Sequence, residues 1–182
     1  MKVKDIKAME RFINTMNIDR IGLGYFISNK NEIVLMNDYS MIIYNNITEN
    51  DKTQIMESIK KSNSIFDADK IINTMTKDEY KEETKEVINI ADLEIVKQIK
   101  RENKLGRNLC TTLEILQHHQ DLIYKNNNVW TNKEMLMIIA NCLGGKQIEV
   151  MNTRDKLRPS KIVGEYGVAY IMPINYKEDE ED

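Results

Sequence analysis

Three short β-like runs near the N-terminus constrain the fold of this chain most. They are Ile21–Ile27, Glu32–Met36 and Tyr39–Tyr44, and the segments between them, Ser28–Asn31 and Asn37–Asp38, are composed of turn-forming residues. Separations of four and two residues suit β-hairpins. The sequence therefore predicts an antiparallel meander.

Two glycines, Gly22 and Gly24, lie inside the first of these runs. A phosphate-binding loop needs a glycine-rich turn that opens directly into a helix. A glycine within a strand instead favours a bulge or a close approach of another backbone segment.

Helices are predicted before and after the meander. Apolar residues recur at helical spacing in Lys4–Met16, Asp51–Lys61 and Leu109–Tyr124. In the second of these helices, the positions expected to face the core are Ile55, Met56 and Ile59. Asp67 can cap a further short helix that extends to Met75.

The C-terminal third contains one strongly apolar helix and two strands. Met135–Leu143 is apolar nearly all round, so we expect it at the centre of the core. A capping box at Thr131–Glu134 opens this helix, and Gly144 with Gly145 ends it. The predicted strands are Gln147–Met151 and Tyr166–Ile174.

The length of 182 residues predicts one domain. Its class is α+β, with a small antiparallel sheet, made of the N-terminal meander and the C-terminal strands, packed with a central helical segment. We expect the domain to span residues 1–176, with a helical middle region at about 51–143. Residues 177–182 include five acids and predict a disordered tail.

Charge is distributed unevenly along the chain. Residues 67–95 contain four Lys or Arg against nine Asp or Glu, whereas residues 96–161 contain twelve against six. No apolar run approaches the roughly 20 residues of a membrane span, and the N-terminus lacks a signal-peptide core. We therefore expect an intracellular, cytoplasmic soluble protein.

The basic segment offers two candidate surfaces. Asp92–Arg107 reads as a helix with Lys97, Lys100, Arg101 and Lys104 at the spacing of one face. Arg107, at the end of this segment, extends the basic face. The loop Asn152–Lys161 adds Arg154, Lys156, Arg158 and Lys161. These cations are interpreted either as a solvated surface or as a site for phosphates or an acidic protein. Because aromatic residues are not interleaved with them, contact with nucleic acid would be directed at the backbone.

The acidic segment offers a third candidate surface. Thr76–Glu79 reads as a capping box that starts a helix, with Tyr80, Val87 and Ile88 on its apolar side. Its acidic residues are Asp78, Glu79, Glu82, Glu83 and Glu86. They form either a solvated helix or, with the acidic tail, a mimic of a phosphate backbone that occupies a basic channel of another protein.

Signals for catalysis are sparse. His118 and His119 are the two histidines, and His119 falls on the apolar face of its predicted helix. Cys110 and Cys142 lack the close spacing of a zinc cluster. No nucleophile motif, P-loop, dinucleotide fingerprint or HExxH sequence is present. We expect no metal and no cofactor, and an enzyme that uses His118 is the least favoured class.

The 182-residue length, the opening MKVKDIKAMERFINTMN, the bias toward isoleucine, asparagine and lysine, and the acidic and basic segmentation run through the whole chain. In these features it resembles phage-type anti-CRISPR proteins that inhibit the type II effector nuclease. The resemblance implies a non-enzymatic protein that binds the nuclease or its guide-RNA complex in the cytoplasm of the bacterial host. The alternative is a small regulatory protein that contacts the DNA or RNA backbone through the basic helix face.

Overall fold

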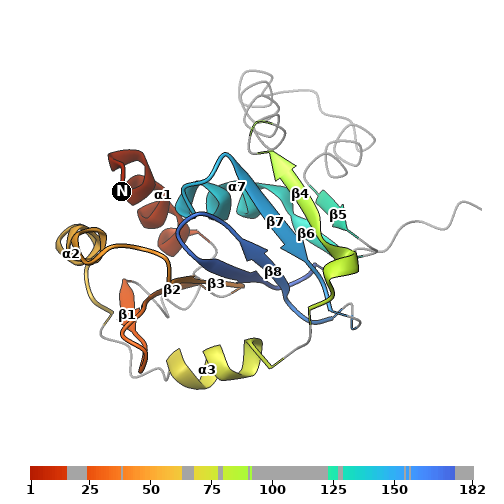
Figure 1. The fold of residues 1–182 in the computed structure, drawn as a ribbon, viewed down its shortest axis with the longest axis horizontal. Helices are drawn as coiled ribbons and strands as arrows, with labels where there is room; N and C mark the ends of the chain where they lie inside the picture. The colour runs from red at the N-terminus through yellow and green to blue at the C-terminus, as the bar shows by residue number, and fades with distance from the viewer. Residues whose placement is uncertain are drawn as a thin grey trace, which may run out of the picture.

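In the computed structural model, the residues described are 1–15, 24–37, 39–62, 68–77, 80–89, 91, 123–126, 129–153, 155 and 157–174. Within them the chain forms four α-helices, a seven-stranded antiparallel sheet and a separate two-stranded hairpin (Figure 1). The predicted α+β class, with an N-terminal meander and C-terminal strands in one antiparallel sheet, is confirmed.

The helices are α1 (Val3–Asn14), α2 (Glu49–Ser58), α3 (Ala68–Met75) and α7 (Lys133–Cys142), with a short 3₁₀ helix η1 (Glu82–Thr84). The strands of the main sheet are β1 (Tyr25–Ile27), β2 (Ile33–Asn37), β3 (Ser40–Tyr44), β4 (Glu86–Asn89), β7 (Gln147–Met151), β8 (Ser160–Val163) and β9 (Val168–Ile171). Their spatial order is β1-β2-β3-β9-β8-β7-β4, and the separate hairpin pairs β5 (Ile123–Asn126) with β6 (Val129–Asn132).

The described chain contains two units of the same connectivity, each a helix followed by three antiparallel strands. One unit is α1-β1-β2-β3 and the other is α7-β7-β8-β9. They meet at the centre of the sheet, where β3 pairs antiparallel with β9 and Ile42 lies opposite Ala169. The order of the strands is thus that of a twofold repeat about the β3 and β9 pair.

The outer edges of the two units differ. β4 pairs antiparallel with β7, whereas at the outer edge of β1 Tyr25 forms an isolated bridge to Lys61, within the short segment Lys60–Ser62. Gly24 makes that second contact possible, because its φ is +124° and a Cβ atom there would lie 2.1 Å from the Lys60 carbonyl oxygen. The close backbone approach predicted for a glycine in this strand is therefore confirmed at Gly24.

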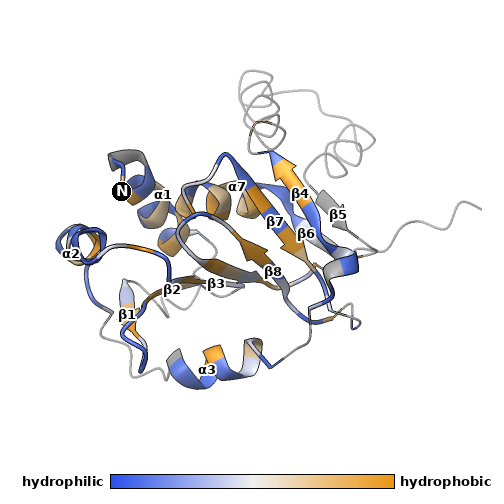
Figure 2. Ribbon diagram, viewed as in Figure 1, coloured by the Kyte–Doolittle hydropathy of each residue, from blue (hydrophilic) through white to orange (hydrophobic). Residues whose placement is uncertain are grey.

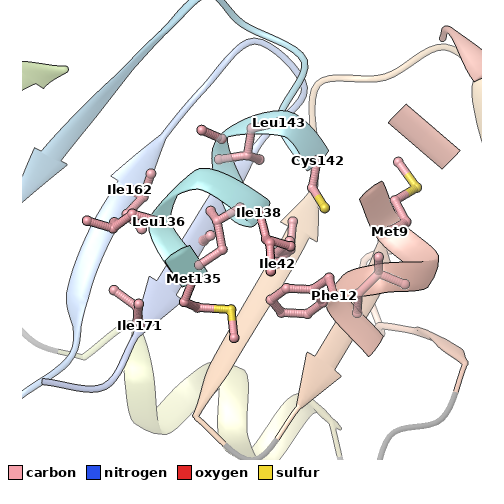
Figure 3. Close-up of a cluster of buried hydrophobic side chains, with 14 of the residues drawn as sticks. Met9, Phe12, Ile42, Met135, Leu136, Ile138, Cys142, Leu143, Ile162 and Ile171 are labelled. Atoms are coloured by element: carbon pink, nitrogen blue, oxygen red, sulfur yellow. The ribbon is translucent and has the colours of Figure 1, made fainter. Parts of the chain in front are cut away.

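The main core lies between the sheet and the pair α1 and α7, which pack side by side on one of its faces (Figure 1). In Figure 3, Phe12 and Met9 of α1 lie against the α7 residues Met135 and Cys142, with Ile42 of β3 nearby. The predicted central role of the apolar helix is confirmed, because seven residues of α7 are buried.

A second, smaller core lies on the opposite face of the sheet. There Ile71, Ile72 and Met75 of α3 pack against a cluster of sheet residues that includes Val34 and Tyr170. The sheet is consequently covered by helices on both faces, and Figure 2 shows its apolar residues concentrated on the strands between them.

The ends of α7 follow the predicted signals with one change. Asn132, not Thr131, is the N-cap, and its side-chain oxygen accepts a 3.0 Å hydrogen bond from the Met135 amide. After the helix, Gly144 adopts a φ of +76°, which is the conformation expected of a C-terminal glycine.

The predicted acidic helix is wrong over its described part. The Thr76 hydroxyl donates to the Ile72 carbonyl at the end of α3, so it does not open a new helix. Further along, η1 is followed by β4, in which Ile88 is buried opposite Ile148 of β7. Burial of Ile88 and strand pairing outweigh the local capping signal.

Three smaller predictions are also corrected. Met56 is 47% exposed, while its neighbour Ile55 is fully buried. The helix predicted to end at Tyr124 cannot include its last two residues, since these belong to β5. The basic loop is shorter than predicted because its last two residues begin β8.

None of the helices in the described ranges is long and apolar enough to cross a membrane.

Candidate interaction surface

Several predicted site residues lie outside the described part of the chain. The whole basic helix face does so, and it comprises Lys97, Lys100, Arg101, Lys104 and Arg107. The same is true of Arg154 and Lys156 in the basic loop, of Asp78 and Glu79 in the acidic segment, and of both histidines. The described candidates are therefore Arg158, Lys161, Glu82, Glu83 and Glu86.

The loop between β7 and β8 is anchored at its base by buried polar groups. The Ser160 hydroxyl donates a 2.6 Å hydrogen bond to the side-chain oxygen of Asn152, and both residues are buried. The Asn152 amide donates to the Thr84 hydroxyl oxygen at 2.9 Å, and the Lys81 amide donates to the Asn152 carbonyl oxygen at 3.2 Å. The loop is thus fixed to the segment around η1.

Within the loop, Asp155 organises the exposed tip. Its carboxylate accepts a 2.9 Å hydrogen bond from the Leu157 amide, and its carbonyl oxygen accepts one of 3.1 Å from the Arg158 amide. Leu157 is 76% exposed, and the Arg158 side chain is also exposed. The described part of the tip therefore presents an apolar and a cationic side chain beside two hydrogen bonds to Asp155.

The described parts of the acidic segment and of the basic loop are neighbours, because Lys81 and Thr84 both form hydrogen bonds with Asn152. Lys81 pairs with Glu83 at 2.8 Å, and Lys85 pairs with Glu149 of β7 at 2.9 Å. At the tip, the Arg158 Nε lies 3.7 Å from the Asp155 carboxylate. These cations have carboxylate partners close by, which lowers the local positive potential.

Lys161 has a different environment. Its Nζ lies 5.7 Å from the centre of the Tyr80 ring, in cation–π geometry. The Tyr80 ring in turn packs at 53° against that of Tyr170, with 5.9 Å between centroids. Burial raises the pKa of the Tyr170 phenol above its ordinary value.

Sequence reasoning treated Tyr80 only as an apolar residue of the acidic helix. Its partner Lys161 is far away in the chain, and the two meet because β8 and β9 bring Lys161 opposite Tyr170. Alternation of Lys161 with the buried residues Ser160 and Ile162 was the available signal for a strand at this position.

No candidate metal site emerges from the described ranges: no group of three or more His, Cys, Asp or Glu there is arranged to hold an ion. Cys142 is buried within the core, and burial raises the pKa of its thiol well above the usual range.

No protein-family model and no curated protein matches this chain. Among solved structures, it is similar to a protein from Eubacterium rectale that is provisionally assigned as a DNA polymerase III beta subunit, with a TM-score of 0.50 and 12% sequence identity. The similarity covers 94% of this chain and 64% of the other, so this chain spans a little under two thirds of that protein's length. At this identity the likeness extends to the fold alone.

Proposed function

We propose that this chain acts by binding another macromolecule, and that its target is a type II CRISPR effector nuclease or the guide-RNA complex of that nuclease. The target class comes from the whole-chain resemblance to phage-type anti-CRISPR proteins. In this proposal the chain blocks DNA binding or cleavage by occupying a surface of the nuclease, without chemistry of its own.

The observation that carries the proposal is the anchored loop between β7 and β8. A loop held by Asn152, Thr84 and Ser160 loses little conformational entropy when it binds, which favours affinity. Its tip exposes Leu157 beside Arg158, and arginine is among the residues enriched at binding hot spots. The mixed charges around η1 suit a protein surface better than a uniform polyanion.

The test is a DNA-cleavage assay with a guide-loaded type II nuclease, together with co-purification of the two proteins. We expect a stable complex and inhibition at or below micromolar concentrations. The double variant Leu157→Ser/Arg158→Glu should inhibit at least tenfold less well, because it alters the tip without touching the loop anchors. Lys7→Glu, at an exposed position of α1, is the matched control and should inhibit like the original chain.

Absence of both binding and inhibition at micromolar concentrations would remove the proposed target. Inhibition that is unchanged in the tip variant but lost when Lys97, Lys100, Arg101 and Lys104 are reversed in charge would move the contact to the basic helix face.

A second candidate function is direct binding to the backbone of DNA or RNA. The observation that favours it is the likeness in fold to a protein named as a subunit of a DNA polymerase. Against it stand the carboxylate partners of Lys81, Lys85 and Arg158, which leave less charge for phosphates.

The two functions differ in their response to salt. Backbone binding predicts affinity for bare nucleic acid that falls steeply between about 50 and 200 mM salt, because counterions are released. Reversal of the charges at Lys97, Lys100, Arg101 and Lys104 should abolish it. An electrophoretic mobility assay across this salt range, without any nuclease, decides between the candidates.

A further inference from the structure

A groove of about 330 Å³ lies between α3 and the sheet face that α3 covers. One wall is a single stripe of the helix, because Asp69, Ile72, Asn73 and Thr76 follow the i, i+3, i+4, i+7 spacing. The floor is apolar and includes Ile43 and Val168. The volume lies at the lower end of the range of small ligand sites.

The two ends of the groove differ in charge. At the start of α3, Asp69 accepts a 3.0 Å hydrogen bond from the Asn29 amide, and Glu32 accepts one of 3.2 Å from the Ser28 hydroxyl. Lys30 also lines this end, which therefore carries two carboxylates and one ammonium group.

The other end is cationic. Lys161 lines the groove beside Tyr170. It lies near the end of α3, because its Nζ is 5.7 Å from the centre of the Tyr80 ring and the Tyr80 hydroxyl donates to the Met75 carbonyl oxygen. The stripe from Asp69 to Thr76 spans seven residues, which corresponds to about 10 Å along the helix axis. The groove thus has a net negative end and a positive end, with the helix stripe of about 10 Å between them.

The rim between these ends is rich in amide groups. Asn29, Asn45 and Asn73 line the groove and are exposed. A carboxamide both donates and accepts hydrogen bonds, as a peptide group does. An apolar floor below amide side chains is suited to an extended peptide, whose backbone needs both donors and acceptors along its length.

We propose that this groove binds a short extended peptide segment of a partner protein. A basic side chain of the segment lies toward Asp69 and Glu32, and a carboxylate lies toward Lys161. Three residues of extended chain span about 10 Å, which matches the length of the α3 stripe along the groove. A nucleic acid is a poorer match, since the lining carries as many carboxylates as ammonium groups.

This inference is independent of the proposed target, because α3 and the β1 to β2 turn take no part in the loop tip. The experiment titrates the isotope-labelled full-length chain with three acetylated, amidated tetrapeptides and follows backbone amide shifts by NMR. The probes are Lys-Val-Val-Glu, Glu-Val-Val-Lys and the neutral Gln-Val-Val-Gln. One charged peptide should shift groove amides saturably, with a Kd at least tenfold below that of the neutral peptide.

Asp69→Asn should raise the Kd of that charged peptide at least tenfold. The asparagine oxygen still accepts from the Asn29 amide, so the turn is retained. Glu57→Gln, at an exposed position of α2, is the matched control and should leave the Kd unchanged.

Three results would overturn the inference. The first is no saturable shift with any peptide at about 5 mM, which is near the weakest, roughly millimolar, binding of interest. The others are equal binding of the neutral peptide and tighter binding of a tetrathymidylate probe in the groove. Peptide binding without nuclease inhibition would support the groove and remove the proposed target. Nuclease inhibition without peptide binding would do the reverse.

Discussion

The Ser160 hydroxyl donates a 2.6 Å hydrogen bond to the side-chain oxygen of Asn152, and neither residue is more than 2% exposed. This contact joins the end of β7 to the start of β8. Because Asn152 also bonds to Thr84 through its main chain, the same point fixes the segment that leads into β4. The presentation of the loop tip therefore depends on one buried polar pair.

Removal of this pair is predicted to destabilise the fold. Ser160→Ala removes the hydroxyl that donates to the Asn152 side-chain oxygen, and such a hydrogen bond contributes about 0.5–1.5 kcal/mol to the unfolding free energy. Asn152→Ala should have a loss of the same order, and the double variant should lose less than the sum. Urea denaturation measures all three. Ser58→Ala, at an exposed position at the end of α2, is the control and should change stability by less than about 0.5 kcal/mol.

Gly24 is predicted to tolerate no side chain. In Gly24→Ala, the new Cβ would meet the Lys60 carbonyl oxygen, and the φ of +124° would strain any L residue. We expect a loss of roughly 1–3 kcal/mol, which is typical of such backbone strain. Hydrogen exchange should also become faster at the Tyr25 and Ser62 amides, whose bonds of 3.0 and 2.9 Å close this edge.

The control for this variant is Asn31→Gly. Asn31 has a φ of +59°, a conformation that glycine adopts readily, so its stability should change by less than about 0.5 kcal/mol. Unchanged stability and unchanged exchange at Tyr25 in Gly24→Ala would contradict the contact with Lys60.

The elements that the sequence predicts and those that it misses differ in how far a local pattern determines their structure. The N-terminal meander, α1 and α7 have local patterns that match their final environments. In the meander, β2 and β3 are buried at every position, α1 buries one face, and α7 buries nearly all of its residues. β4 and β8 are short and carry charged residues such as Glu86 and Lys161. They are strands because β7 lies between them, and a pairing of distant segments leaves little trace in a local pattern.

The candidate surfaces likewise combine local features, which the sequence predicts, with contacts between distant segments, which it does not. Arg158 and the exposed loop tip could be inferred from local composition. The neighbours of the loop could not, because Thr84 lies 68 residues from Asn152 in the chain. The groove could not be inferred from the sequence either. α3 was predicted as a helix, but its position over Ile43 and Val168 depends on the second core, which forms only in the folded chain.

The register of α2 makes a direct comparison possible between neighbouring residues. Ile55 is fully buried against the core, whereas Met56 is 47% exposed. Ile55→Ala should therefore lower the unfolding free energy by about 2–5 kcal/mol, through lost burial and the cavity left behind. Met56→Ala should change it by less than about 0.5 kcal/mol. Similar losses at the two positions, measured by urea denaturation, would contradict the register of this helix.

Tyr44 makes the stability of the core sensitive to high pH. Burial is the main cause that raises the pKa of Tyr44 well above 10, and its hydroxyl donates a 3.3 Å hydrogen bond to the Cys142 carbonyl oxygen. A group whose pKa is higher in the folded state contributes its full share to the unfolding free energy at pH values below its unfolded pKa. This contribution is lost as the pH rises toward the folded pKa. The chain should therefore lose stability above about pH 10, near the reference pKa of tyrosine.

Tyr44→Phe separates this effect from others. At pH 7 the variant should lose about 0.5–1.5 kcal/mol, the usual contribution of one hydrogen bond. Above pH 10 its stability should fall less steeply than that of the original chain, because phenylalanine has no proton to lose. Urea midpoints from pH 7 to 11 provide the comparison, and parallel curves for the two proteins would show that Tyr44 does not titrate on unfolding.

The buried thiol of Cys142 supplies an independent check on the same part of the core. Because burial raises its pKa and the residue is fully covered, the reactive thiolate is scarce while the chain is folded. In a Cys110→Ser background, we expect no reaction with a thiol reagent at pH 8 until denaturant unfolds the protein, and complete reaction afterwards. Colorimetric thiol counting across a urea titration tests this. Full labelling of Cys142 in the absence of denaturant would show that α7 opens without global unfolding, and would place the helix outside the stable core that α1 and the sheet form with it.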